Sequence, residues 1–582
     1  MLDSGPEYIT QSDQAAQIAA QLAGQSLLGV DIETTGLDCH SSRIRLVSVA
    51  TLAGRVVVFD LASVSVQALA WLSEAPWIAY SAQFEQQHMT EAGFAVPKLN
   101  DAMLLDRLHS HQLRKLDAAA ADVLGLELDK TMQTSDWTGE LSAEQIDYAG
   151  LDALAAVRIG VELRPGIEKR GQWRLYRLWR DAGRVLADLS RRGHCVDWQA
   201  HNRLREQWGT EQDELKAQLA VVLGDRNPNS GPQLGEWLRE NLPTKRIKSW
   251  PTTPTGRLKT DADTLALFAD LDGVQQLIRY KAVAKLLGTY GKGYAKHRHP
   301  LTDRLHPSYS IGFTVTGRVS AARPNTQNPP RLPEFRQVFV PDNGYSMIGA
   351  DFSQIELRIA ALLSRDRAMI TAYAAGHDLH AITAAAITQS DLESVTPEQR
   401  RAAKAVNFGS LFGQRGAGLA RTALKNYGVT MTEAEADAYL CRWAAQFPEL
   451  AGWQRRQIQL ARDRRQVITR LGLIRDFDVQ RTGYLAGEAT NVPIQGSAAE
   501  VQLEAVTRLP SALAPSGAVL SHNIHDEVVI EVPQGNESQA AAALRDSMQT
   551  AMLAVFPEAE QLGLAGADLI ELKQGANWAE VH

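Results

Sequence analysis

Three short apolar stretches, LLGVDIE, RLVSVAT and RVVVFDL, lie within residues 27–61 and are separated by Gly, Asp and Ser residues that favour turns. Their length and alternation predict three strands. Helical periodicity follows and ends with residues 142–163. Strands and helices in this proportion predict an α/β domain over residues 1–165.

The pattern changes after this domain. Residues 166–305 place Leu, Ala, Arg and Lys at helical spacing, which predicts long and partly exposed helices. From residue 307 onward, strand patterns such as YSMIGAD and the hairpin-like VLSHNIHDEVVIEV lie between helical segments, as in an α+β domain. With 582 residues the chain exceeds what one core usually supports, so we expect a multidomain protein.

Composition narrows the class of protein. Hydrophobic residues make up 45% and charged residues 22% of the chain, which is typical of a soluble globular protein. No signal peptide and no apolar run of membrane-spanning length is found, so we expect a cytoplasmic protein that is not secreted and does not contact a membrane. Cys39, Cys195 and Cys441 are too far apart in sequence to indicate a disulfide framework or a zinc site.

The net charge of −7 argues weakly against a nucleic-acid partner. Residues 239–304, however, contain thirteen Lys or Arg against six Asp or Glu, interleaved with Trp and Tyr. Such a segment can bind a duplex backbone, although a solvated basic face without a ligand is an equally good interpretation of this segment alone.

Two carboxylates, Asp31 and Glu33, lie on the same face of the first predicted strand, because side chains alternate along a strand. Tyr148 and Asp152 are four residues apart and therefore share one face of a helix. Carboxylates that converge in this way can hold two divalent cations for phosphodiester hydrolysis, and Tyr148 could orient the attacking water. A solvated strand edge is the alternative for the Asp31 and Glu33 pair taken alone.

The segments DIET and YAGLD, with SAQFEQQH, DAMLLDRL and KTMQTSDW between them, resemble the DEDD family of 3′-to-5′ exonucleases. The resemblance implies a ribonuclease H-like domain that binds two Mg²⁺ ions. Its metal ligands would be Asp31, Glu33, Glu85 and Asp152, and its catalytic residues Asp31, Glu33, Tyr148 and Asp152. The family usually has Asp where Glu85 stands, and we expect the extra methylene to slow the reaction, because a displacement of about 1 Å can cost ~100-fold in rate.

A second set of carboxylates lies in the C-terminal half. Asp351 ends the strand in YSMIGAD, and Glu356 follows in the first turn of a helix. His525, Asp526 and Glu527 lie between two apolar stretches, as at a hairpin tip. Asp351 and Asp526 could bridge two metal ions of the kind that phosphoryl transfer requires.

Arg400, Lys404, Phe408 and Phe412 recur every four residues and form one stripe on a predicted helix. Such a stripe is unfavourable in either usual setting. A dry core would bury two cations, and a solvated face would expose two aromatic rings. The stripe would suit a nucleoside triphosphate, with the cations on the phosphates and the rings on sugar and base. An amphipathic helix with snorkelling cations is the alternative.

DFSQIELR, RRAAKAVNFGSLFG and IHDE resemble motifs A, B and C of family A DNA polymerases, and TGRVSAARPNTQNPP, TNVPIQGSAAE and GANWAEVH also match, in the order of the family. The resemblance implies a right-hand polymerase over residues 166–582 that synthesises DNA on a template, with the exonuclease domain as its proofreader. The thumb would span about 174–310, the palm about 311–370 and 440–582, and the fingers about 371–439.

The resemblance also implies roles for individual residues. The catalytic group would be Asp351, Asp526, Glu527 and Lys404, with Asp351 and Asp526 as metal ligands. Glu356 would exclude a ribose 2′-hydroxyl. Phe412 stands where the family commonly has Tyr. Residues implied in binding the primer-template or the incoming nucleotide are Arg400, His380, Phe408, Phe412, Glu356, Gln354, Arg318, Asn325, Gln327, Asn491, Gln495 and His525.

We expect two Mg²⁺ ions in each site, with Mn²⁺ as a substitute, and primer-template DNA and dNTPs as partners. We expect a monomer from a bacterial or phage-infected cell, and no partner for processivity is evident in the sequence. Three alternatives stay open: a 3′ exonuclease on a polymerase scaffold, a non-catalytic DNA-binding protein, and a single-subunit RNA polymerase. Intact Asp351, Asp526 and Lys404 weigh against the first two, and Glu356 weighs against the third.

Overall fold

The computed structural model describes residues 5–22, 24–96, 99–478 and 485–582, which include every predicted site residue. The chain forms two compact units. The first unit comprises Met1–Gly193, Ser308–Ala322 and Ile348–Leu572, and the second unit comprises His194–Pro307, Arg323–Met347 and Lys573–His582. In the described part of the chain, no helix combines the length and apolar character that crossing a membrane requires.

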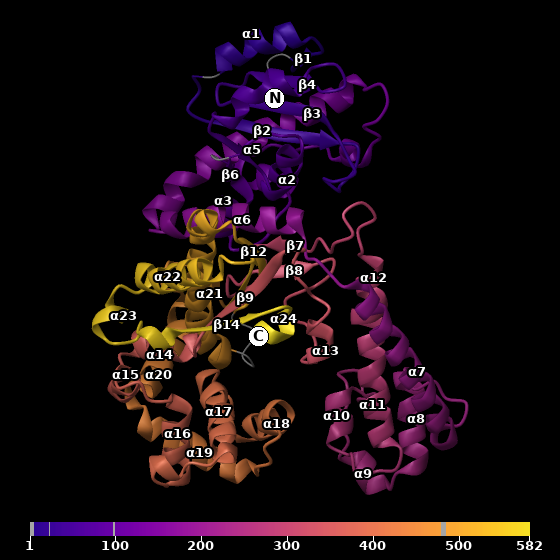
Figure 1. The fold of residues 1–582 in the computed structure, drawn as a ribbon, viewed down its shortest axis with the longest axis vertical. Coiled ribbons are helices and arrows are strands. Elements are labelled where there is room, and N and C mark those ends of the chain that lie inside the picture. The colour runs from indigo at the N-terminus through magenta and orange to yellow at the C-terminus, as the bar shows by residue number, and fades with distance from the viewer. Residues whose placement is uncertain (1–4, 23, 97–98, 479–484) are drawn as a thin grey trace. The chain divides into compact units, whose positions relative to one another are not determined.

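A six-stranded sheet occupies the N-terminal part of the first unit, in the order β1-β4-β3-β2-β5-β6 (Figure 1). Strands β2, β3 and β4 pair antiparallel, whereas β5 and β6 run parallel to β2. This mixed sheet confirms the α/β prediction. The strands are β1 (Glu7–Ile9), β2 (Leu28–Thr34), β3 (Ile44–Thr51), β4 (Val56–Asp60), β5 (Trp77–Ala79) and β6 (Leu99–Asp101).

Helix α5 (Ala143–Lys169) packs directly on strand β2. Its N-terminus is closed by a capping box of Ser142 and Gln145. The close approach depends on Gly29, where an added Cβ would lie 2.0 Å from the carbonyl oxygen of Ala153. This packing brings the middle of α5 beside the strand that carries Asp31 and Glu33.

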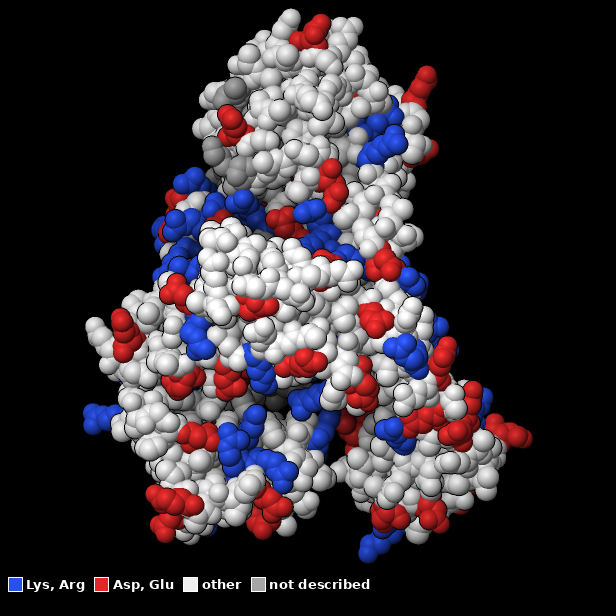
Figure 2. Space-filling view, viewed as in Figure 1, with Lys and Arg blue, Asp and Glu red and all other residues white. Residues whose placement is uncertain are grey.

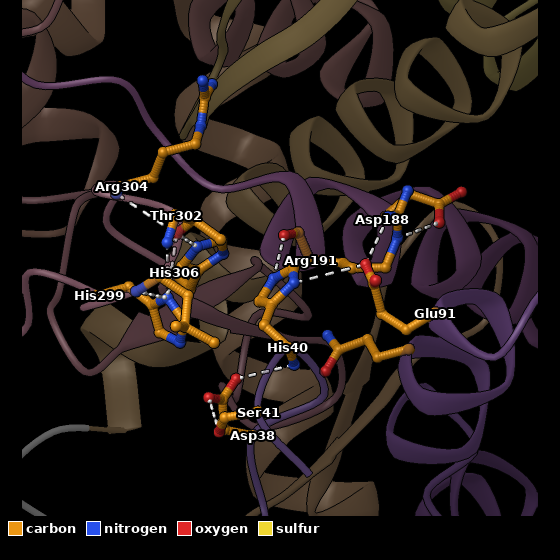
Figure 3. A network of polar contacts seen from close by, with 12 residues as sticks. Asp38, His40, Ser41, Glu91, Asp188, Arg191, His299, Thr302, Arg304 and His306 are labelled. Atoms are coloured by element: carbon orange, nitrogen blue, oxygen red, sulfur yellow. Dashed lines mark hydrogen bonds and ion pairs between the residues drawn. The ribbon is translucent and has the colours of Figure 1, made fainter. Parts of the chain in front are cut away.

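Helix α6 (Trp173–Arg192) connects the N-terminal sheet with the remainder of the first unit. It packs against α2 (Gln83–Glu91) and α3 (Ala102–Ser110) on one side and against α21 (Leu485–Leu513) on the other. At its last turn, the ring of His40 donates from Nε2 to the carbonyl oxygen of Arg191 at 2.8 Å, and Arg191 Nη1 donates to Glu91 at 2.8 Å (Figure 3). These polar contacts add to the apolar packing of the helix.

A second sheet has the order β12-β13-β9-β14 and confirms the predicted α+β pattern. Strands β12 and β13 form an antiparallel hairpin with His525 and Asp526 at its tip, as predicted. Glu527, expected at the tip with them, is the first residue of β13 and pairs with Ile524. Helix α21 packs against β12, α14 (Ile355–Ser364) and α22 (Glu537–Val555). The strands are β9 (Tyr345–Phe352), β12 (Val519–Ile524), β13 (Glu527–Pro533) and β14 (Ile570–Gly575).

Six helices fill residues 367–464 of the first unit (Figure 1). Helices α16, α17, α18 and α19 pack on one another. Helix α17 begins with Pro397 after a capping box of Thr396 and Gln399, which fixes where its stripe of cations and rings starts. The helices are α15 (Arg367–Ala374), α16 (Leu379–Thr388), α17 (Pro397–Leu411), α18 (Gly416–Tyr427), α19 (Glu433–Gln446) and α20 (Pro448–Arg464).

The second unit is mainly helical. The sequence predicts helices over residues 166–305, and the part of this range from residue 194 onward belongs to this unit. Its own core contains Trp237 and the stacked rings of Trp250 and Phe268, whose centroids lie 3.8 Å apart. Its longer helices are α7 (Trp198–Leu223), α8 (Gly231–Asn241) and α11 (Val274–Lys285). Its shorter ones are α9 (Thr244–Lys248), α10 (Ala262–Ala266), α12 (Gly293–Lys296), α13 (Pro333–Arg336) and α24 (Trp578–Val581).

Candidate active sites

The first cluster of carboxylates lies where β2, α2 and α5 meet. Val30 and Ile32 are buried, whereas Asp31 and Glu33 point to the other face of the strand, as the alternation predicts. Burial, followed by the charges of Asp152, Glu33 and Glu85, raises the pKa of Asp31 well above its ordinary value. Burial and the charge of Asp152 also raise the pKa of Glu33 to about 8. The predicted carboxylates are therefore close enough to act on one another.

Lys130 lies inside this cluster. Its Nζ donates to Asp152 Oδ2 at 2.6 Å and to the hydroxyl of Tyr148 at 3.4 Å, and it lies 4.9 Å from the centroid of the Tyr148 ring. Burial raises the pKa of Asp152, and the ammonium of Lys130 opposes that rise. Sequence reasoning missed this residue, although it lies in the KTMQTSDW segment that resembles the exonuclease family.

Glu85 and Asp101 are neighbouring buried carboxyls with different surroundings. Asp101 accepts from four backbone N–H groups, two beside the start of α2 and two in the first turn of α3. The Glu85 side chain is 4% exposed, and its Oε2 has no hydrogen-bond partner among the described residues. Burial raises the pKa of Glu85 well above its ordinary value. Asp101 is thus satisfied by the fold, whereas Glu85 is not.

The second cluster lies at the adjoining ends of β9 and the β12–β13 hairpin. The backbone N–H of Phe352 donates to the carbonyl oxygen of Asp526 at 3.4 Å, next to Asp351. Desolvation by the surrounding chain, followed by the charges of Asp526, Glu527 and Glu571, raises the pKa of Asp351 to about 8. The structure therefore brings Asp351 and Asp526 together. Glu571 on β14 is a further carboxylate that sequence reasoning missed.

Glu356 lies in the first turn of α14, as predicted, and forms an ion pair with Arg318. The Glu356 side chain is 12% exposed. Burial raises its pKa, and the guanidinium of Arg318 opposes that rise. His525, at the hairpin tip, has a positive φ of 54°, and burial lowers its pKa.

The predicted stripe on α17 changes from polar to apolar along the helix. Arg400 and Lys404 are exposed, and Figure 2 shows basic side chains gathered over the helix that carries them. Phe408 and Phe412 are half-buried, with ring centroids 6.2 Å apart. Phe412 follows the last residue of the helix.

Asp378, immediately before α16, joins three of the predicted substrate-binding residues. Its Oδ1 accepts from the backbone N–H of His380 at 3.0 Å and from Gln354 Nε2 at 3.4 Å. Its Oδ2 accepts from the guanidinium of Arg400. Sequence reasoning missed Asp378, although an Asp directly before an apolar helix is a helix-capping signal that could have found it.

The remaining predicted residues divide between the two units. Asn491 and Gln495 lie four residues apart on α21, and Asn491 Oδ1 is buried without a partner among the described residues. Asn325 and Gln327 belong to the second unit. There the hydroxyl of Tyr294 donates to the carbonyl oxygen of Asn325 at 2.7 Å.

No three His, Cys, Asp or Glu side chains within the described ranges form a ready-made metal-binding group. The donor chemistry nevertheless fits a divalent cation, because Mg²⁺ prefers carboxylate oxygens and both clusters hold several of them. The unpartnered Oε2 of Glu85 is a further carboxyl oxygen that a cation in this cluster could meet.

Comparison with known proteins identifies the class to which these two sites belong. Residues 6–168 match the model of a 3′-5′ exonuclease, and residues 199–580 match the model of DNA polymerase family A. The chain therefore belongs to DNA polymerase family A and contains a 3′-5′ exonuclease domain. The family and the exonuclease resemblance seen in the sequence are confirmed.

Several bacterial enzymes named DNA polymerase I are similar to this chain. The thermostable enzyme of Thermus filiformis is 33% identical over 72% of this chain and 51% of its own length. The Aquifex aeolicus enzyme is 28% identical over 95% of this chain and 97% of its own length. The Pseudomonas aeruginosa enzyme is 29% identical over 99% of this chain and 66% of its own length. The chain thus spans about half the length of the first of these relatives.

A solved structure has the same fold. The POL domain of Pol1 from M. smegmatis, solved in complex with DNA primer-template and dNTP, superposes with a TM-score of 0.85. The match covers 99% of this chain and 100% of that one at 24% identity. This match confirms the predicted fold, an exonuclease domain combined with a right-hand polymerase.

Proposed function

We propose that this chain performs template-directed DNA synthesis from dNTPs and removes mispaired 3′ ends. The observation that carries the proposal is the convergence of Asp351 with Asp526 at the hairpin tip, which is the arrangement that metal-assisted phosphoryl transfer requires. Membership of DNA polymerase family A supports it. The separate cluster around Asp31 and Asp152 supports the exonuclease activity.

We assign residues 1–165 to the exonuclease domain and residues 166–582 to the polymerase domain. Within the latter, the thumb is about 174–310, the fingers about 371–439, and the palm about 311–370 and 440–582. The second unit includes His194–Pro307, which supports a largely independent thumb.

Family A polymerases and 3′-5′ exonuclease domains depend on metal ions. Asp351 and Asp526 would hold two Mg²⁺ ions in the polymerase site. Asp31, Glu33, Glu85 and Asp152 would hold two in the exonuclease site, and Mn²⁺ could substitute in both. When bound, such ions activate the attacking oxygen and neutralise the leaving one.

In the polymerase site, Arg400, Lys404 and His380 hold the triphosphate of the incoming nucleotide. Lys404 also supplies a proton to the departing pyrophosphate, as an exposed ammonium next to the phosphates can. Asp378 fixes Arg400 and the first turn of α16 in position.

Selection of the sugar and of the base pair uses other residues. Glu356, held by Arg318, occupies the space of a ribose 2′-hydroxyl, and Phe408 packs on the sugar. Gln354 and Phe412 complete the nucleotide pocket, and Glu527 supports the two metal ligands. The minor groove and backbone of the primer-template are contacted by Arg318, Asn325, Gln327, Asn491, Gln495 and His525. Minor-groove acceptors are nearly alike for all base pairs, so these contacts test pair geometry and leave sequence to the template.

In the exonuclease site, the hydroxyl of Tyr148 orients the attacking water. Lys130 holds both this hydroxyl and Asp152 in place. A mispaired end reaches this site because unstacking is least costly for a mismatch.

We propose primer-template DNA and dNTPs as the ligands and a monomer as the working form. The similar M. smegmatis domain was solved with DNA primer-template and dNTP.

The proposal is tested by primer extension on a defined template with the wild type, Asp526→Ala and Asp31→Ala. Asp526→Ala should abolish synthesis and retain removal of a single-stranded 3′ end, and Asp31→Ala should do the reverse. Glu356→Ala should increase rNTP incorporation relative to dNTP. Synthesis that survives Asp526→Ala would refute the assignment of the polymerase site, and an unchanged rNTP ratio would refute the role of Glu356.

A further inference from the structure

Asn407, one residue before Phe408 on α17, makes a network of buried hydrogen bonds behind the stripe. Its Nδ2 pairs with His380 Nδ1 at 2.9 Å. Its Oδ1 accepts from Thr383 Oγ1 at 2.9 Å and from Trp443 Nε1 at 2.8 Å. All four side chains are at most 3% exposed. The network joins α16, α17 and α19 in the interior of this group of helices.

The direction of each hydrogen bond follows from the chemistry of the groups. An indole nitrogen only donates, so the atom of Asn407 that faces Trp443 must be the carbonyl oxygen. The amide nitrogen then faces His380, and because it only donates, His380 Nδ1 must accept. A neutral imidazole whose Nδ1 accepts carries its proton on Nε2.

We infer that Asn407 is a positioning residue that keeps His380 as the neutral imidazole with its proton on Nε2, so that His380 offers one fixed N–H donor to the incoming nucleotide. The inference rests on the proposed function, which places His380 at the triphosphate. It adds to that function the tautomer of His380, the hydrogen bond that fixes this tautomer, and a role for Asn407, which touches no substrate.

The surrounding charges agree with a neutral ring. The charged groups that act on His380 are Asp378 at the start of its own helix and Lys404 and Arg400 from α17. Helix α19 contributes Trp443, which carries no charge. Burial, with Lys404 and Arg400 opposing Asp378, lowers the pKa of His380 to about 4. The neutral ring of His380 can therefore donate to a phosphate oxygen beside two cations without being repelled by them. Its protonation state stays the same from pH 6 to pH 8.5.

The direct test is nuclear magnetic resonance of the full chain labelled with ¹⁵N-histidine. The chain has 14 histidines, and His380→Gln identifies the signals of His380 by their loss. We expect the spectrum of a neutral ring protonated on Nε2 from pH 6 to pH 8.5. A proton on Nδ1, or a charged ring at pH 7, would overturn the inference.

Asn407→Asp is the informative variant, because it keeps the shape and replaces the donor with an acceptor. The donors Thr383 and Trp443 favour the ionised carboxylate, so His380 Nδ1 must carry a proton to keep the hydrogen bond and the ring should titrate near neutral pH. We expect the KM for dNTP to change at least about 10-fold between pH 6 and pH 8.5 in this variant and to stay flat in the wild type, in keeping with the 10- to 100-fold effect of groups that orient a functional histidine. A pH profile identical to that of the wild type would overturn the inference.

Thr383→Val is the matched control, since it removes one donor to Asn407 Oδ1 and leaves the one from Trp443. We expect less than about a threefold change in the KM for dNTP, because one hydrogen bond still fixes the amide. Exonuclease activity of each variant shows that the chain is folded. If His380→Gln leaves the KM for dNTP unchanged, the role of His380 in the proposed function fails. If His380→Gln raises it while Asn407→Asp keeps the wild-type profile, only the role of Asn407 fails.

Discussion

The two acidic clusters of the first unit balance their charge in different ways. In the exonuclease cluster, Lys130 lies among the carboxylates and donates to Asp152 at 2.6 Å. In the polymerase cluster, no described Lys or Arg forms an ion pair with Asp351 or Asp526, although the guanidinium of Arg318, paired with Glu356, opposes the rise in the pKa of Asp526. Lys404 and Arg400, the latter paired with Asp378, are exposed on another helix.

The difference suits two different substrates. A 3′ end brings one phosphodiester at a time, and a site with a built-in ammonium has less charge left to neutralise. A triphosphate brings several charges, so a polymerase site gains from exposed cations that can meet it. The comparison predicts that the exonuclease cluster is stabilised by the fold itself and that the exposed cations of α17 serve the ligand.

Of the substitutions that test this comparison, Lys404→Ala should have the largest effect, a slower rate of DNA synthesis. Removing a cation that stabilises charge developing in the transition state costs about 100- to 1000-fold in rate. Single-turnover incorporation of one dNTP should slow by this factor, while removal of a single-stranded 3′ end should keep its wild-type rate. Equal losses in both reactions would mean that the substitution disturbs the fold and would break the comparison.

Glu85→Asp should have the next largest effect, and it should change only the rate of the exonuclease reaction. The shorter side chain restores the carboxylate position that is usual in the exonuclease family, and a correction of about 1 Å can change a rate by up to ~100-fold. We expect faster digestion of a single-stranded 3′ end and unchanged synthesis. A slower exonuclease would show that this site is built around the glutamate.

Lys130→Met tests the built-in cation through stability. Without metal, the variant leaves Asp152 without its cation among other carboxylates, and we expect a loss of about 1 to 3 kcal/mol in the free energy of unfolding, restored by Mg²⁺. Chemical denaturation with and without Mg²⁺ measures both quantities.

Lys404→Met is the matched control in the polymerase site. An exposed lysine away from structural features should change stability by less than about 0.5 kcal/mol. Equal losses for the two variants would remove the distinction between the clusters.

Glu500 is buried but belongs to neither cluster. It therefore shows what burial does to the pKa of a carboxyl group outside the two sites. Burial raises its pKa to about 8, although Thr469 and the backbone of Leu471 donate to it. The folded pKa exceeds the unfolded value of 4.5, so the folded chain holds the extra proton and the contribution of Glu500 to stability falls as pH rises from about 4.5 to 8. The stability of the wild type relative to Glu500→Gln should therefore fall by up to about 1.4 kcal/mol per pH unit over this window. Parallel curves for the two proteins would contradict this reading of Glu500.

Local patterns predicted much of both sites. The alternation in LLGVDIE placed Asp31 and Glu33 on one face, and the apolar stretches around IHDE placed Asp526 at a hairpin tip. These features depend on residues that are neighbours in the chain, so a sequence is sufficient to find them.

Residues that act across the fold were not predictable in this way. Lys130 reaches Asp152 from a segment without regular periodicity, and Glu571 becomes a neighbour of Asp351 only when β14 pairs with β9. Asn407 acquires its partners from the packing of three helices. The family resemblance supplied the motif positions, but it did not supply these contacts.

The central claim is that Asp351 and Asp526 act as one unit around shared cations. A double-mutant cycle of single-turnover synthesis with Asp351→Asn, Asp526→Asn and the double variant tests it most directly. Residues that work as a unit lose their function together, so the double variant should be about as slow as the slower single variant. Losses that multiply in the double variant would mean that the two carboxylates act independently, which would contradict the proposed site.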